Sequence, residues 1–141
     1  MSVDFYILEQ ASEEKSRRFA CQCIEKAYNS QKKIYLQVDT NEEAERMDKL
    51  LWTFRDDSFL PHQLYPSSDH LNTPILIGYG EVTFNPRDML INLSKQIPSF
   101  YKQFNHVIEI VFDDPTVQQL ARERYRQYRD QGCEINTHRI K

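Results

Sequence analysis

Glycine is scarce in this chain, which has only three among its 141 residues: Gly78, Gly80 and Gly132. Loops that cradle phosphates or dinucleotides need several glycines at fixed spacing between a strand and a helix. Gly78 and Gly80 do not provide that spacing, and we interpret them as a turn. The sequence therefore contains no recognisable nucleotide-binding loop.

Cysteine is equally scarce. Cys21, Cys23 and Cys133 are too few, and odd in number, for a disulfide framework, which is typical of a reducing compartment. The first two fall in a predicted helix, where residues two apart point about 200° away from each other and do not readily share a metal ion. We interpret them as structural thiols.

Signatures of catalysis and of metal binding are also absent. The four histidines do not have a paired metal-ligand spacing, such as two residues four apart on one helix. No serine lies in a Gly-x-Ser-x-Gly elbow, the turn that exposes a hydrolase nucleophile. We expect no cofactor, no metal ion and no catalytic residue.

Long apolar runs and a strong positive charge are missing too. No run approaches the roughly 18 apolar residues of a membrane span, and the first ten residues do not resemble a signal peptide. We therefore expect a cytoplasmic protein without a membrane partner. The net charge of −3 repels a nucleic-acid backbone, so any positive site must be a local patch.

Apolar and aromatic residues, by contrast, are plentiful, at 40% and 12% of the chain. Their spacing predicts alternating strands and helices within a single domain over residues 1–141. This order favours the α/β class, as a three-layer α/β/α sandwich around a mainly parallel (mixed) sheet. We predict strands at 4–8, 32–38, 74–79, 89–93, 106–112 and 133–140, and helices at 12–31, 39–54 and 116–130, with a short helix near 99–104.

The segment 55–73 interrupts this alternation. It contains two prolines and several turn-forming residues, so we predict a long loop. Phe59, Leu60 and Tyr65 give this loop an apolar character, and we expect them to be exposed. Long loops that carry apolar residues are more often functional than idle.

The stretch QQLARERYRQYRDQG (118–132) concentrates arginine in a predicted helix. On a helical wheel, Leu120, Ala121, Tyr125 and Tyr128 form a buried stripe. The residues that share the flank beside this stripe are Gln118, Arg122, Arg126 and Arg129. Arg124 falls within the stripe itself, so we predict that it reaches the edge of the sheet or pairs with a carboxylate.

Three interpretations of the arginine flank are open from the residues alone. It is a solvated helix face, a site for a short acidic peptide, or a path for single-stranded DNA. For the peptide site, Val111, Val117 and Tyr125 would supply an apolar trough. The overall negative charge makes the DNA path the weakest of the three.

Several stretches resemble the HolC-type chi subunit of the bacterial DNA polymerase III holoenzyme. They are FYIL near the start, RMDKLLWTFRDDSFLPH (46–62), and QLARERYRQYRDQG (119–132) followed by INT (135–137). Their order and spacing extend along essentially the whole chain. The middle and C-terminal stretches are long enough to make the resemblance specific.

The resemblance implies a non-catalytic adaptor with an α/β fold, a subunit of a polymerase whose catalysis lies elsewhere. Proteins of this family form a 1:1 heterodimer with the psi subunit, which ties them to the clamp loader. They also bind the acidic, phenylalanine-ended C-terminal tail of single-stranded DNA-binding protein. These partners imply a cytoplasmic, replisome-associated protein with no direct sequence-specific binding of nucleic acid.

The resemblance also implies site residues. The basic position central to the tail site matches Arg122, and its surroundings match Tyr125, Val117 and Val111. A second basic position of the family falls on the uncharged Gln118. This departure would weaken tail binding unless Arg126 or Arg129 substitutes for the missing charge.

The psi-facing surface of the family includes the positions that match Trp52 and Phe59, to which we add the neighbouring Leu60. An exposed Trp/Phe pair is what a protein-binding hot spot needs. Another reading places Trp52 in the core at the end of its helix. A different function also remains open: a nucleotide- or nucleic-acid-processing enzyme with its site at the C-terminal ends of the strands.

Overall fold

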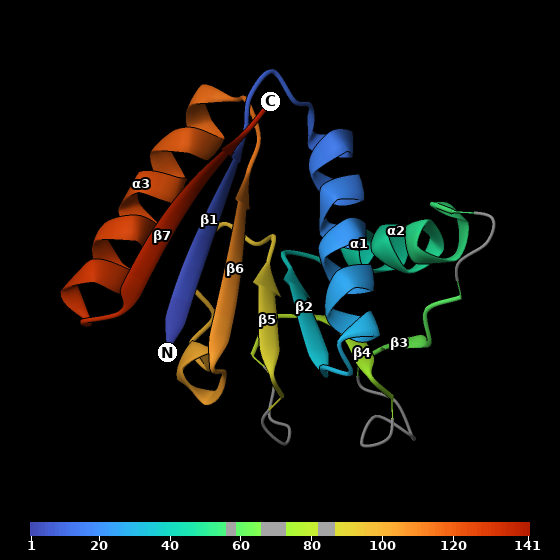
Figure 1. Ribbon diagram of the computed structural model, residues 1–141. Helices are drawn as coiled ribbons and strands as arrows, with labels where there is room; N and C mark the ends of the chain where they lie inside the picture. The colour runs from blue at the N-terminus through green and yellow to red at the C-terminus, as the bar shows by residue number, and fades with distance from the viewer. Residues whose placement is uncertain (56–58, 66–72, 82–86) are drawn as a thin grey trace.

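Seven parallel strands form one sheet in a computed structural model of the protein, which describes residues 1–55, 59–65, 73–81 and 87–141 (Figure 1). The order across the sheet is β3-β4-β2-β5-β6-β1-β7, and every described pair of neighbours is parallel. The strands are β1 (Ser2–Leu8), β2 (Ile34–Val38), β3 (His62–Leu64), β4 (Ile75–Tyr79), β5 (Met89–Asn92), β6 (His106–Val111) and β7 (Glu134–Ile140). The predicted α/β class is confirmed, and none of the described pairs makes the sheet mixed.

Between these strands, the described residues form three α-helices and one short 3₁₀-helix. They are α1 (Glu13–Asn29), α2 (Asn41–Thr53), η1 (Tyr101–Gln103) and α3 (Pro115–Asp130). Strand β3 lies inside the segment predicted to be a loop, so that prediction was wrong for His62–Leu64. Such a short strand gives too little alternation to be recognised from sequence.

The helices cover opposite faces of the sheet. Side chains of α1 and α2, including Ile24 and Met47, pack in one core cluster, whereas Tyr128 of α3 packs with Phe104 in a second cluster on the other face. Alternate residues of β1, β2, β4, β5 and β6 lie in the two clusters because strand side chains alternate between faces. Figure 1 shows α3 on one side of the sheet and α1 with α2 on the other, which confirms the three layers.

Local capping explains where the helices begin. Asp114 precedes α3, and its Oδ1 accepts hydrogen bonds from the backbone N–H groups of Thr116 at 2.9 Å and Val117 at 3.0 Å. Pro115 follows as the first helical residue, a position where its missing N–H costs nothing. At the other end Gly132 has φ 79°, the left-handed conformation that favours glycine after a helix.

The two thiols of α1 are inert, one of them buried and the other partly buried. Cys21 is fully buried, and burial raises the pKa of Cys21 to about 12 and that of Cys23 to about 11. Both thiols are therefore protonated at neutral pH and are poor nucleophiles and poor metal ligands. This agrees with their interpretation as structural thiols.

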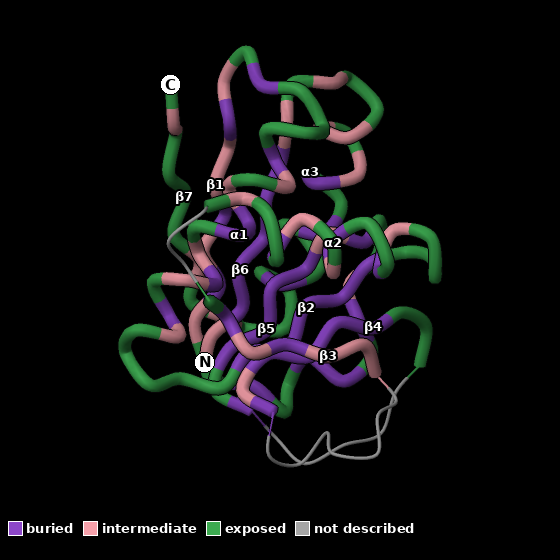
Figure 2. The backbone as a smooth tube through the Cα atoms, turned by 90° about the vertical axis from the view of Figure 1, so that its right-hand side faces the viewer, coloured by how far each residue is buried: buried purple, intermediate pink, exposed green. Residues whose placement is uncertain are grey.

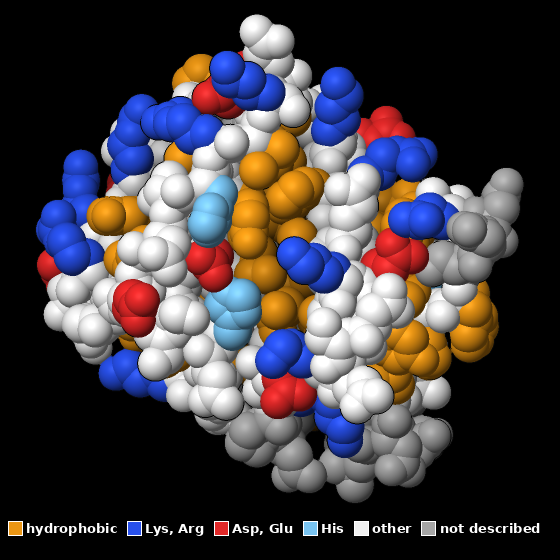
Figure 3. All heavy atoms as spheres, viewed as in Figure 1, with side chains coloured by type: hydrophobic (Ala, Val, Ile, Leu, Met, Phe, Trp, Pro, Cys, Tyr) orange, Lys and Arg blue, Asp and Glu red, His pale blue; other side chains and the backbone are white. Residues whose placement is uncertain are grey.

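The sheet is deeply buried at its centre and exposed at one edge. Figure 2 shows buried residues along β2, β4, β5 and β6, whereas β7 is mostly exposed. Strand β1 lies between β6 and β7, so the two ends of the chain are neighbours in the sheet. On the α1 side of this edge, an apolar strip bordered by histidines is open to solvent (Figure 3).

Candidate functional site

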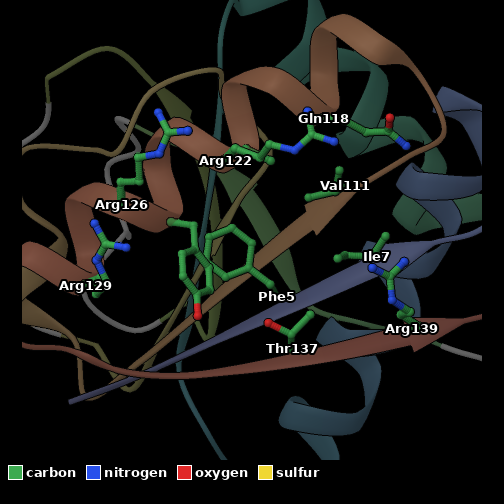
Figure 4. Close-up of a pocket in the computed structure, with 11 residues that line it drawn as sticks. Phe5, Ile7, Val111, Gln118, Arg122, Arg126, Arg129, Thr137 and Arg139 are labelled. Carbon is green, nitrogen blue, oxygen red and sulfur yellow. The ribbon is translucent and has the colours of Figure 1, made fainter.

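A groove of about 450 Å³ runs beside α3 on the face of the sheet that this helix covers (Figure 4). Phe5 and Ile7 of β1 and Val111 of β6 lie at its floor, and β7 borders it opposite the helix. The residues that line it are Phe5, Ile7, Val111, Gln118, Ala121, Arg122, Tyr125, Arg126, Arg129, Thr137 and Arg139.

The structure brings together six of the seven residues predicted for the peptide site. These are Val111, Gln118, Arg122, Tyr125, Arg126 and Arg129. Val117 does not line this groove and instead lines a second one on the opposite flank of α3. The reason is helical geometry, because Val117 points about 100° away from its neighbour Gln118.

Tyr125 is more exposed than predicted. Its side chain is 38% exposed and packs at the groove against Phe5, with ring centroids 5.6 Å apart. The buried stripe of α3 consists instead of Ala121, Arg124 and Tyr128. Placing Tyr125 and the partly exposed Leu120 in that stripe was therefore wrong.

The groove is strongly positive although the protein is acidic. Among the described residues, four arginines line it, Arg122, Arg126 and Arg129 from α3 and Arg139 from β7, and no Asp or Glu does. Arg122 and Arg126 form no ion pair with any residue in the described parts of the chain. Their guanidinium groups are therefore available to carboxylates of a ligand.

The groove also contains five residues that were not predicted for the peptide site: Phe5, Ile7, Ala121, Thr137 and Arg139. Phe5 and Ile7 alternate along β1, and Thr137 and Arg139 alternate along β7, so each pair shares one face. That signal is present in the sequence. The pairing of β1 with β7, which joins the two pairs into one surface, has no local signal.

Arg124 lies beneath the groove and pairs with a carboxylate, as predicted. Its Nε donates to Oε1 of Glu109 at 3.0 Å, and both side chains are almost fully buried. Burial raises the pKa of Glu109, whereas the Arg124 charge and hydrogen bonds from Asn92 and Tyr128 oppose that shift. Arg124, the fourth arginine of α3, is thus paired inside the protein and does not contribute its charge to the groove.

A second candidate surface lies at the end of α2. Trp52 is 50% exposed and Phe59 is 68% exposed, and their ring centroids are 5.5 Å apart. The reading that places Trp52 in the core is therefore wrong. Leu60 is only 2% exposed and packs in the core, so its predicted exposure was also wrong. The two neighbouring aromatic side chains of Trp52 and Phe59 are thus exposed, whereas Leu60, the residue that follows Phe59, is buried.

The carboxyl ends of the strands, where an α/β enzyme holds its ligand, form a groove of about 330 Å³. Its charged lining residues are the basic Arg17, Lys95 and Arg124 and the acidic Glu13, Asp39, Glu43 and Asp114. Arg17 is already paired with Glu13 and, at 3.5 Å, with Glu43. The excess of carboxylates makes this place unfavourable for a nucleotide phosphate.

No group of three or more His, Cys, Asp or Glu side chains in the described ranges is arranged to hold a metal ion. Among the helices of those same ranges, none is both long enough and apolar enough to cross a membrane.

Known proteins resemble this chain along nearly its whole length. It is 36% identical over 138 residues to the DNA polymerase III subunit chi of Pseudomonas aeruginosa, covering 98% of this chain and 96% of that protein. It is 32% identical over 140 residues to the DNA polymerase III subunit chi of Haemophilus influenzae, covering 99% of this chain and 97% of that protein. The identity to the DNA polymerase III subunit chi of Escherichia coli is 30% over 121 residues, covering 85% of this chain and 82% of that protein.

A family description agrees with these relatives. The sequence model of the family described as DNA polymerase III chi subunit, HolC, matches residues 1–136. That match includes α3 and both aromatic residues of the second surface. The chain therefore belongs to the DNA polymerase III chi subunit family.

Proposed function

We propose that this accessory subunit of the DNA polymerase III complex is a non-catalytic adaptor whose groove binds the acidic, phenylalanine-ended tail of single-stranded DNA-binding protein. One observation carries the proposal: in the part of the chain that the structure describes, four arginines and no carboxylate surround an apolar floor, in a protein of net charge −3. Carboxylates of the tail pair with the arginines, and an aromatic side chain covers Phe5, Ile7 and Val111.

Within this arrangement Arg122 holds the centre of the groove wall. It is exposed on α3, and its one described hydrogen bond is a 3.5 Å contact with the amide of Gln119. A ligand carboxylate therefore replaces water and a weak contact, without breaking an ion pair. The guanidinium geometry favours two parallel hydrogen bonds to such a carboxylate.

Binding of a synthetic acidic peptide that ends in phenylalanine tests the proposal. We expect Arg122→Ala to weaken binding about 10- to 100-fold, since hydrogen bonds to charged groups contribute about 1.5 to 3 kcal/mol. Binding is also expected to weaken with added salt, because exposed charges are screened. Arg18→Ala removes an exposed arginine of α1 that is outside the groove, and it serves as the matched control.

Several results would contradict the proposal. Equal affinity of wild type and Arg122→Ala would exclude the assigned site. Tight binding of a labelled single-stranded oligonucleotide in an anisotropy titration, with no binding of the peptide, would favour the DNA path instead. A peptide with an amidated C-terminus tests whether the terminal carboxylate contributes.

For the second surface, we propose that Trp52 and Phe59 bind the psi subunit in a 1:1 heterodimer, which links the chain to the clamp loader. Two large aromatic side chains exposed side by side are typical of an interface hot spot. Trp52 belongs to α2 and Phe59 precedes β3, whereas the groove is formed by α3, β1, β6 and β7. Both partners therefore have separate binding sites, and the protein acts in the cytoplasm at the replisome.

A further inference from the structure

A single buried carboxylate connects α3 to the centre of the sheet. Glu109 of β6 is 0% exposed and accepts three hydrogen bonds on the face that α3 covers. The donors are Nδ2 of Asn92 at 2.9 Å, Nε of Arg124 at 3.0 Å and the hydroxyl of Tyr128 at 2.6 Å. Two of these three donors belong to α3, one helical turn apart.

Arg124 has a second attachment to the sheet layer. Its Nη1 donates to the backbone carbonyl of Lys95, just beyond β5, at 2.9 Å. The guanidinium is therefore fixed at two of its nitrogens, to two different segments. Because hydrogen bonds depend strongly on distance and angle, this attachment defines the position of the helix more narrowly than apolar contacts do.

Apart from the ring of Tyr128, which packs against Phe5 and Tyr101, α3 has few fully buried apolar side chains. Its buried residues are only Ala121, Arg124 and Tyr128. A buried ion pair contributes little net stability compared with well-packed apolar residues of similar volume, so stability alone does not account for Arg124 and Glu109. What such a pair supplies is a defined orientation.

The orientation of α3 decides where its exposed arginines lie. A helix with its side chains has a radius of about 5 to 6 Å, so a rotation of about 20° about its axis moves a surface group by roughly 2 Å. That displacement is enough to break a hydrogen bond between a guanidinium and a ligand carboxylate.

We propose that Glu109 is a positioning residue for the groove: through Arg124 and Tyr128 it sets the rotation of α3 and thereby brings Arg122, Arg126 and Arg129 together over the apolar floor. This inference rests on the proposed binding of an acidic peptide in the groove. It assigns to three buried residues, none of which lines the groove, a role in the affinity of the site.

Two variants test the role. Tyr128→Phe removes one hydrogen bond to Glu109 and no charge, and we expect peptide affinity to fall about three- to fivefold. The double variant Glu109→Leu with Arg124→Met removes both buried charges together, which avoids leaving one of them unpaired. We expect its affinity to fall at least about tenfold and its dependence on salt to become shallower, although every groove residue is unchanged.

The matched control is Met47→Ala, which creates a cavity in the core on the other face of the sheet. It is expected to lose stability and to bind the peptide like wild type, measured where all variants are folded. If Tyr128→Phe and any folded double variant also bind with wild-type affinity and salt dependence, the positioning role is excluded. Failure of the wild type to bind the peptide, or full binding by Arg122→Ala, would instead remove the proposed function.

Discussion

His138 of the edge strand β7 donates a hydrogen bond from Nε2 to Oδ1 of Asp4 in β1, at 3.0 Å. His106 of β6 bonds the other oxygen of the same carboxylate. The three side chains link three adjacent strands on the face opposite the groove beside α3. Tyr6 stacks on the His138 ring, with centroids 4.7 Å apart. Strand β7, which has only one neighbouring strand, is thereby fixed by side chains as well as by backbone.

This cluster predicts a loss of stability in acid. Burial alone would raise the pKa of Asp4, but hydrogen bonds and charges from His138 and His106 hold it below its usual value of 3.8. A lowered folded-state pKa means that the unfolded chain binds the proton more readily. The contribution of Asp4 is therefore complete above about pH 5 and is lost as the pH falls below 3.8 through the folded-state pKa.

Urea unfolding of Asp4→Asn at pH 7, 5 and 3 measures that contribution. The variant is expected to be about 1 kcal/mol less stable than wild type at pH 7, since it loses charged hydrogen-bond acceptors, with the difference shrinking at pH 3. Glu14→Gln, at an exposed carboxylate, is the control. A difference that is constant over all three pH values would contradict the assignment.

Trp52, Phe59 and Leu60 are expected to respond differently to truncation. Trp52→Ala and Phe59→Ala remove exposed rings, so the free energy of unfolding should change by less than about 1 kcal/mol. The free energy of binding to psi should become weaker by about 2 kcal/mol or more. Leu60→Ala leaves a cavity in the core and should lower the free energy of unfolding by about 2 to 5 kcal/mol. Thermal unfolding and a titration with purified psi separate the two effects. Intact psi binding by the Trp52→Ala, Phe59→Ala double variant would exclude this surface.

A substitution at Gln118 tests whether an added positive charge in the groove increases the affinity for the peptide. Gln118 lies at the groove without a charge, and its side-chain amide makes a 3.5 Å contact with Asp113. Gln118→Lys adds a positive charge to the groove wall, so we expect about two- to tenfold tighter peptide binding at low salt and a steeper salt dependence. Gln22→Lys adds the same charge on the exposed surface of α1 and should leave the affinity unchanged. No gain from Gln118→Lys would mean that the ligand carboxylates do not reach this position.

Substitution of Gly78 tests how closely β4 packs against Tyr35 of β2. A Cβ atom at this position would overlap the hydroxyl of Tyr35, which is fully buried and donates to Gln37 at 3.0 Å. Gly78→Ala should therefore cost about 1 to 3 kcal/mol of stability through overpacking. Adding Tyr35→Phe removes the atom that overlaps and should recover part of this loss. Additive losses in the double variant, measured by denaturant unfolding, would show that the overlap is relieved elsewhere.

Much of the fold is readable from residue spacing. The helices were predicted within a few residues of their ends because the caps Ser12 and Asp114 and the glycine after α3 are local signals. The flank shared by Gln118, Arg122 and the arginines after it follows from helical periodicity. The same periodicity correctly directs Arg124 inward, toward a carboxylate that the sequence does not identify.

Other features depend on contacts between distant segments. The role of Arg139 at the groove follows from the pairing of β7 with β1, which no local pattern encodes. Leu60 and Phe59 are adjacent apolar residues, and only the fold decides that one is buried and the other exposed. Val117 has the apolar character expected of the trough but points to the opposite flank.

The position of β1 between β6 and β7 has a consequence for synthesis of the chain. Asp4 and His138 are 134 positions apart in sequence, yet they bond side by side in the sheet. On the ribosome, the first strand is made long before either of its neighbours, and contacts of such high sequence separation form slowly. Its apolar residues stay without a partner during that interval, when they are open to chaperones or to aggregation. We expect the groove floor to form late in folding, because it needs strands from both ends of the chain.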